Sequence, residues 1–195
     1  MSEFSLYFAL GKDHILDYAN GYDHILFVIA LCAIYIARDW KKVFILVTAF
    51  TIGHSITLAL ATFRIVQFRT ELIEFLIPLT ILITAVSNLF RSEETVNRQA
   101  IQTNYILALG FGLIHGLGFS NYLHALLGTN ENILTQLFAF NLGLELGQII
   151  VVAIFMGISF ILVDLIALKR RDWKLVISSA IAGMALLLIK ETIFW

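Results

Sequence analysis

The chain has 195 residues, of which 59% are hydrophobic and 14% are charged, and its formal net charge at pH 7 is −1. This composition and the mean hydropathy of +0.89 exclude an ordinary soluble domain and indicate an integral membrane protein. The weak net charge argues against a nucleic-acid partner, and the single cysteine, Cys32, excludes an intramolecular disulfide.

The first twenty residues read as an extramembrane or interfacial segment of a single transmembrane domain, 1–195. The sequence Gly-x-Asp-His-Ile-Leu occurs twice here, at 11–16 and at 21–26. On one ideal helix His14 and His24 would lie about 80° apart, and Asn20-Gly21 between them is a turn signal. The two copies therefore belong to separate segments.

Six apolar stretches follow, each a candidate to cross the hydrocarbon core of about 30 Å. The pattern predicts an all-α bundle of six or seven transmembrane helices. The first stretch is short and must borrow a turn from the residues before it, whereas the fifth would be about 51 Å long as one helix. We therefore expect the fifth to be broken, strongly tilted or partly interfacial. The stretches are 22–37, 43–63, 72–90, 104–127, 135–168 and 174–194.

Lysine and arginine counts predict the orientation of these stretches, because cytoplasmic loops carry the excess of both residues. With the N-terminus outside, nine lie inside and four outside, which favours both termini outside. The inner set is Arg38, Lys41, Lys42, Arg91, Arg98, Lys169, Arg170, Arg171 and Lys174; the outer set is Lys12, Arg64, Arg69 and Lys190.

The ionisable residues of the apolar stretches converge in depth. Asp23 and His24 open the first stretch, His54 and His115 each lie eleven residues into their stretches from the inside, and Glu145 lies ten residues into the fifth from the outside. All are thus expected between the midplane and the outer face. Ionisable groups at membrane depth are costly unless they find partners or water, so they suggest function.

Polar residues accompany these groups on the same helix faces. Asn141, Glu145 and Gln148 lie within about 60° on a helix, and Thr48, Thr51 and Ser55 form a second stripe, with His54 at its edge. A single histidine or a threonine row is as often packing as function, but the set together predicts a site. The residues expected to orient its ligands are Asn141, Gln148, Thr51 and Ser55.

Imidazoles and carboxylates without a thiol suit a borderline divalent ion, such as nickel, cobalt, zinc or copper. No catalytic residue and no organic cofactor is predicted. The expected metal ligands are His24, His54, His115, Asp23, Glu145 and His14.

Four blocks of this sequence resemble the HupE/UreJ family in residues and in order. They are GYDHILF at 21–27, TAFTIGHSITL at 48–58, FGLIHGLGF at 111–119 and FNLGLELGQ at 140–148. That family comprises small membrane proteins associated with hydrogenase and urease gene sets, which are taken to be nickel or cobalt permeases. The resemblance implies a bacterial inner-membrane location. Its implied partners are the lipid bilayer, the metal ion, and a second copy of the chain or proteins that mature a metalloenzyme.

Three functions are compatible with these residues. In a permease, the ion would pass a vestibule formed by Asp13, His14 and Asp17 and would then reach the inner histidines. In an intramembrane zinc-type enzyme, Glu145 or Asp23 would be the general base for a metal-bound water. A metal chaperone or sensor is the third alternative. Transport is favoured over catalysis by the family resemblance.

Overall fold

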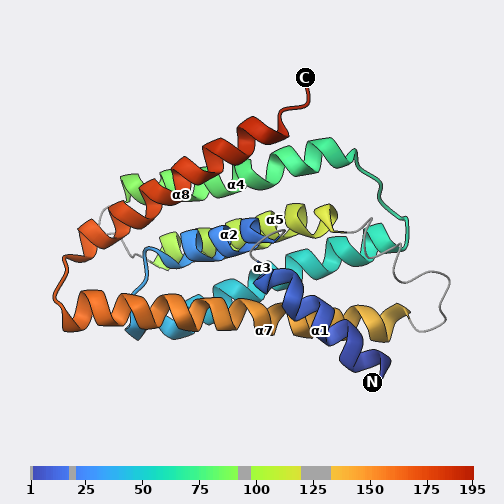
Figure 1. The fold of residues 1–195 in the computed structure, drawn as a ribbon, viewed down its shortest axis with the longest axis horizontal. Helices are drawn as coiled ribbons and strands as arrows, with labels where there is room; N and C mark the ends of the chain where they lie inside the picture. The colour runs from blue at the N-terminus through green and yellow to red at the C-terminus, as the bar shows by residue number, and fades with distance from the viewer. Residues whose placement is uncertain (1, 18–20, 92–97, 120–132) are drawn as a thin grey trace.

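The computed structural model describes residues 2–17, 21–91, 98–119 and 133–195, and every regular element in these ranges is a helix (Figure 1). The predicted all-α class is therefore confirmed for these ranges. A 3-10 turn, η1, precedes α3, and a π-helical turn, η2, extends α7. The elements are α1 (Glu3–Leu16), α2 (Tyr22–Cys32), η1 (Ala37–Asp39), α3 (Trp40–Thr62), α4 (Thr70–Phe90), α5 (Arg98–Gly118), α7 (Ile133–Ser159), η2 (Phe160–Leu165) and α8 (Arg170–Thr192).

Four of the described helical stretches are long and apolar enough to cross a membrane, which supports an integral membrane protein. Two further apolar helices, Tyr22–Cys32 and Asn104–Gly118, are shorter. The number of six or seven crossings therefore stays a prediction, and residues 120–127 of the expected fourth crossing lie outside the described ranges. The four long stretches are Ala37–Thr62, Thr70–Phe90, Ile133–Leu165 and Arg170–Thr192.

Two expected stretches have different boundaries in the structure. The helix predicted over 22–37 ends at Cys32, because the chain turns there and the amide of Tyr35 donates to the Cys32 carbonyl at 2.9 Å. The stretch predicted over 135–168 is one continuous helical run from Ile133 to Leu165, whose last six residues widen into η2. Its length is thus accommodated without a break.

The helices lie in three tiers. In Figure 1, α4 and α8 run side by side along one side of the bundle, α7 with α1 across it lies along the other, and α2, α3 and α5 lie between. Three of the helices that carry predicted site residues are thus in the middle tier, and α1 and α7 border it.

Glycines set the closest helix contacts. A Cβ on Gly11 of α1 would collide with the backbone of Phe140 in α7, and one on Gly143 would collide with the backbone of Phe8. Small residues at such points let helix backbones touch. The N-terminal helix is therefore fixed against the middle of α7, although it is not among the candidate membrane spans.

Glycines also join α3 to α5. A Cβ on Gly112 would meet the carbonyl oxygen of Phe50, and one on Gly116 would meet the carbonyl oxygen of His54. Because rising residue numbers on one helix meet rising numbers on the other, α3 and α5 run parallel. This contact holds the histidine of α3 against the helix that carries His115.

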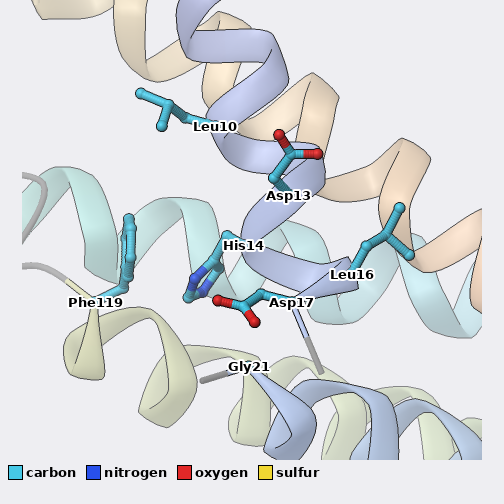
Figure 2. Close-up of a pocket in the computed structure, with 7 residues that line it drawn as sticks. All are labelled: Leu10, Asp13, His14, Leu16, Asp17, Gly21 and Phe119. Carbon is cyan, nitrogen blue, oxygen red and sulfur yellow. The ribbon is translucent and has the colours of Figure 1, made fainter. Parts of the chain in front are cut away.

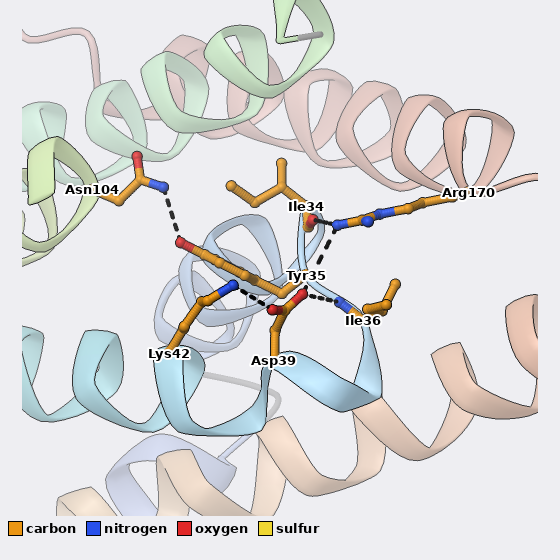
Figure 3. Close-up of polar contacts among 7 residues, drawn as sticks. All are labelled: Ile34, Tyr35, Ile36, Asp39, Lys42, Asn104 and Arg170. Carbon is orange, nitrogen blue, oxygen red and sulfur yellow. Dashed lines mark hydrogen bonds and ion pairs between the residues drawn. The ribbon is translucent and has the colours of Figure 1, made fainter. Parts of the chain in front are cut away.

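Polar contacts tie the helices together at the end of the bundle where α2 leads into α3 (Figure 3). Asp39 accepts a hydrogen bond from Lys42 Nζ at 2.6 Å and lies 4.0 Å from the Arg170 guanidinium. The amide nitrogen of Asn104 donates to the Tyr35 hydroxyl at 3.0 Å. These contacts fix the ends of α3, α5 and α8 relative to the turn that follows α2.

Candidate metal centre

Three histidines from three helices meet inside the bundle. His14 lies in the last turn of α1, His24 in the first turn of α2, and His54 in the middle of α3. One ligand nitrogen of each lies within 4.8 Å of the others. The ring centroids are 4.6 Å apart for His14 and His24, 5.9 Å for His24 and His54, and 6.4 Å for His14 and His54. Small side-chain rotations would let one ion contact all three imidazoles.

The second glycine of the duplicated motif brings the two copies together. Gly21 precedes α2 and lies against the end of α1, where a Cβ would collide with the carbonyl oxygen of His14. The Gly21 amide also donates to the Asp17 carbonyl at 2.8 Å. Because these backbones touch, the rings of His14 and His24 meet edge to face.

Asp23 holds the ring of His24 in one orientation. Its Oδ1 accepts hydrogen bonds from His24 Nδ1 at 2.9 Å and from the His24 backbone amide at 2.8 Å. The proton on Nδ1 leaves the lone pair on Nε2, which is buried and has no hydrogen-bond partner among the described residues. A carboxylate behind an imidazole is the usual arrangement that orients a metal-binding histidine. Direct ligation by Asp23 stays a prediction.

His54 is completely buried, and neither of its ring nitrogens has a hydrogen-bond partner in the described part of the chain. The same holds for Nε2 of His14. A buried polar atom without a partner costs about 1–3 kcal/mol. Several such nitrogens in one cluster are therefore expensive, and a cation bound between them would satisfy their lone pairs.

His115 lies beside the three histidines, with its ring centroid 5.3 Å from that of His24. The Thr80 hydroxyl donates to the Ile77 carbonyl at 2.7 Å, so its oxygen must accept the proton of His115 Nε2, which is 3.1 Å away. The lone pair of His115 is thereby placed on Nδ1, which is buried without a partner among the described residues. His115 is not one of the three histidines whose ligand nitrogens lie within 4.8 Å of one another. Its Nδ1, without a partner among the described residues, has the chemistry of a fourth ligand.

A cavity of about 710 Å³ opens beside this cluster (Figure 2). Asp13 is largely exposed there and pairs with Lys12 at 3.2 Å, while Asp17 follows the last turn of α1. The expected vestibule residues Asp13, His14 and Asp17 thus line the cavity, and His14 also belongs to the histidine cluster. The described lining residues are Leu10, Asp13, His14, Leu16, Asp17, Gly21 and Phe119.

The environment of His14 favours its neutral form. Burial lowers the pKa of His14 well below its ordinary value of 6.5, and the nearby imidazole of His24 acts in the same direction. Metal binding requires an unprotonated imidazole nitrogen. The lowered pKa of His14 is therefore compatible with the role of a metal ligand at neutral pH.

Glu145 does not join the histidines whose ligand nitrogens lie within 4.8 Å of one another. Instead, its carboxylate accepts a hydrogen bond from the Thr48 hydroxyl at 2.8 Å. Thr51, on the same face of α3, lies 2.8 Å from the side-chain oxygen of Gln148. The two predicted polar stripes therefore face each other across α3 and α7, one to two turns along α3 from His54.

The other predicted orienting residues have different surroundings. Ser55 donates its hydroxyl proton to the Thr51 carbonyl at 2.7 Å, within its own helix. Asn141 has a buried side-chain oxygen without a partner in the described ranges. The sequence analysis did not identify Thr80, because one threonine in an apolar stretch of helix gives no signal of a polar contact.

Comparison with known proteins gave one match. A family model described as HupE / UreJ protein matches residues 1–194. Searches of curated proteins and of solved structures found no match to this chain.

Proposed function

Because the chain belongs to the HupE/UreJ family, we propose that it is a permease for a divalent transition-metal ion of the nickel or cobalt type. One observation carries the proposal: three histidine nitrogens lie within 4.8 Å of one another, and nitrogens of all three rings are buried without a hydrogen-bond partner in the part of the chain that the structure describes. Neutral imidazoles suit nickel, cobalt, zinc and copper. The ion is the transported substrate in this proposal.

The cavity beside His14 supplies the entrance. Asp13 and Asp17 line it, and their negative charges raise the local concentration of a cation. At its inner wall, His14 is the first imidazole that the ion meets. Transfer to His24 and His54 then replaces water ligands with nitrogen ligands, while the charge of Asp23 behind His24 partly offsets that of the ion.

We place the cavity on the outer side of a bacterial inner membrane, with both termini outside. The support is the distribution of basic residues. Lys42 and Arg170, together with Arg91 and Lys174, gather at the end of the bundle away from the cavity, where Lys174 donates to the Arg91 carbonyl. An excess of lysine and arginine is typical of the cytoplasmic side.

A metal-dependent enzyme is the main alternative, and the surroundings of the two expected general bases speak against it. Asp23 holds His24, and Glu145 binds Thr48 across a different interface. A general base must reach the water or substrate that it deprotonates. Both carboxylates are thus engaged in other contacts, and the histidine cluster supports ion binding better than it supports hydrolysis.

Flux measurements test the proposal. Proteoliposomes containing the protein should accumulate Ni²⁺ or Co²⁺, and His54→Ala should abolish accumulation and strip the ion from purified protein. Thr57→Ala is a matched control, because among the described residues this hydroxyl, one turn further along α3, donates to carbonyls of its own helix. Equal flux and equal metal content in wild type and His54→Ala would reject the assignment. Binding without flux would favour a chaperone, a sensor or an enzyme.

A further inference from the structure

A second group of polar side chains lies between α3 and α7, apart from the histidines. We call it the oxygen cluster; it comprises Thr48, Thr51, Glu145 and Gln148. Two contacts of 2.8 Å cross the interface, one from Thr48 to Glu145 and one between Thr51 and Gln148. Every side-chain atom in these contacts is an oxygen, so the cluster differs in chemistry from the imidazole group.

The hydrogen bonds of the oxygen cluster are incomplete. The single hydroxyl proton of Thr51 faces two acceptors, the Val47 carbonyl at 3.1 Å and Gln148 Oε1 at 2.8 Å. Gln148 is completely buried, and its Nε2 has no partner among the described residues. One turn before Glu145 on the same face of α7, Asn141 has a buried oxygen that also lacks a partner there. The interface thus contains a buried amide nitrogen, on Gln148, and a buried amide oxygen, on Asn141, that both lack a partner in the described ranges.

The charge of the cluster is also unbalanced. The contact of Glu145 is with a neutral hydroxyl, and in the described ranges its carboxylate forms no ion pair with lysine, arginine or histidine. Glu145 lies in the middle of Ile133–Leu165, the longest candidate membrane span. An ionised carboxylate at membrane depth requires a cation or a polar path.

The oxygen cluster lies further from the entrance than the histidines do. Phe119, which lines the cavity, lies one turn past Gly116, and Gly116 contacts α3 at His54 and Thr57. Thr51 and Thr48 lie in the opposite direction along α3, about 4.5 Å and 9 Å from His54 along the helix axis. The order along α3 is therefore cavity, histidines, oxygen cluster.

We propose that the oxygen cluster is a second cation site, which receives the divalent ion after the histidines on its way to the opposite end of the bundle. Glu145 supplies the charge, and Thr48, Thr51 and Gln148 supply neutral oxygens. Carboxylate, hydroxyl and amide oxygens favour harder ions than imidazole does. The site therefore holds a transition metal more weakly than the histidines, as onward movement between successive sites requires. This inference rests on the proposed transport function.

Binding of Mn²⁺ to the purified full chain tests the second site, because Mn²⁺ prefers oxygen ligands. We expect electron paramagnetic resonance to show Mn²⁺ bound to the wild type, and Glu145→Gln to weaken this binding by at least about tenfold. Glu71→Gln is the matched control, since Glu71 is an exposed glutamate in the first turn of α4. Equal Mn²⁺ affinity in Glu145→Gln and Glu71→Gln would overturn the proposal.

A Co²⁺ titration separates this inference from the proposed function. The visible spectrum of Co²⁺ distinguishes nitrogen from oxygen ligands, so Glu145→Gln should keep the nitrogen-type spectrum while losing Mn²⁺. The retained spectrum also shows that the variant is folded. His54→Ala should do the opposite. Loss of both ions in both variants would show one shared site and overturn the inference, whereas normal Co²⁺ binding in His54→Ala would overturn the histidine site alone.

Thr48→Val provides a milder change at the same place, since valine keeps the shape of the side chain and removes its hydroxyl. It should weaken Mn²⁺ binding less than Glu145→Gln does and leave the Co²⁺ spectrum unchanged. An unaltered Mn²⁺ affinity in this variant would remove Thr48 from the site and contradict the proposed ligand set.

Discussion

The rings of His14 and His24 lie edge to face, with centroids 4.6 Å apart and planes inclined by 68°, although one ends α1 and the other begins α2. The two copies of the motif thus form one side of the histidine cluster together. The aspartates of the two copies have different surroundings: Asp13 lines the cavity beside the cluster, and Asp23 holds a histidine ring.

This arrangement predicts that Gly21→Ala damages the cluster without touching a ligand. The added Cβ would collide with the His14 carbonyl oxygen and separate α1 from α2. We expect a loss of about 1–3 kcal/mol in unfolding free energy and weaker Co²⁺ binding by titration. Gly157→Ala in α7 is the control, because its Cβ would meet no atom of another described helix within 4 Å. The same Co²⁺ affinity in both variants would contradict the role given to Gly21.

Asp23→Asn should weaken metal binding about 10–100-fold, because the amide orients the His24 ring less strongly than the carboxylate does. Isothermal titration with Ni²⁺ measures the change. Asp13→Asn, at an exposed aspartate of the cavity, should leave equilibrium affinity nearly unchanged and slow only the association rate. An Asp23→Asn affinity equal to that of Asp13→Asn would argue against the carboxylate–imidazole contact.

Thr80→Val tests the fourth histidine. Removal of the hydroxyl leaves the Nε2 proton of His115 buried without an acceptor, which should cost about 1–3 kcal/mol of stability. It should also reduce the thermal stabilisation produced by added Ni²⁺, because the lone pair on Nδ1 is no longer fixed. Thr84→Val, whose hydroxyl donates within α4, is the comparison. If both variants gain the same stabilisation from Ni²⁺, His115 has a packing role only.

Stability without metal should decrease in acid, and His14 should contribute to the decrease. Its pKa is lowered in the folded state, so below about 6.5 the unfolded chain binds a proton that the folded chain does not. The contribution of neutral His14 to the unfolding free energy is therefore complete above pH 6.5. It is lost as the pH falls toward the pKa of His14 in the folded state. Melting temperatures in detergent between about pH 7.5 and about pH 5 should fall less for His14→Gln than for wild type. Parallel curves for the two proteins would contradict this prediction.

Much of the architecture follows from the sequence. Apolar runs of membrane length predicted the helices, and the cost of ionisable groups at membrane depth predicted that His24 and His54 would face inward together. Both predictions use only the type of each residue and its distance from the end of its apolar stretch, and both can be read directly from the sequence. The sequence predicted Glu145 as a ligand beside these histidines, whereas the structure pairs it with Thr48, because depth alone does not determine which neighbouring helix a side chain faces.

The remaining features depend on contacts between helices that are distant in the sequence. The fit of Gly11 against Phe140 determines where α1 lies, and nothing within residues 1–20 indicates that partner. The proton on His115 is likewise placed by Thr80 of another helix. Such pairings are set by the shapes of both surfaces, so they appear only when the helices are assembled.

The contact between Gly11 and Phe140 also determines when the histidine cluster can form during synthesis. His14 is made well before α7, but the surface that holds α1 belongs to α7, which is made after α2, α3, α4 and α5. Until α7 has entered the membrane, α1 lacks the helix against which its glycine packs, and only its C-terminal end contacts the start of α2. In the proposed permease, metal capture is therefore a late event in biogenesis, because an incompletely translated chain has no complete site with which to bind the ion.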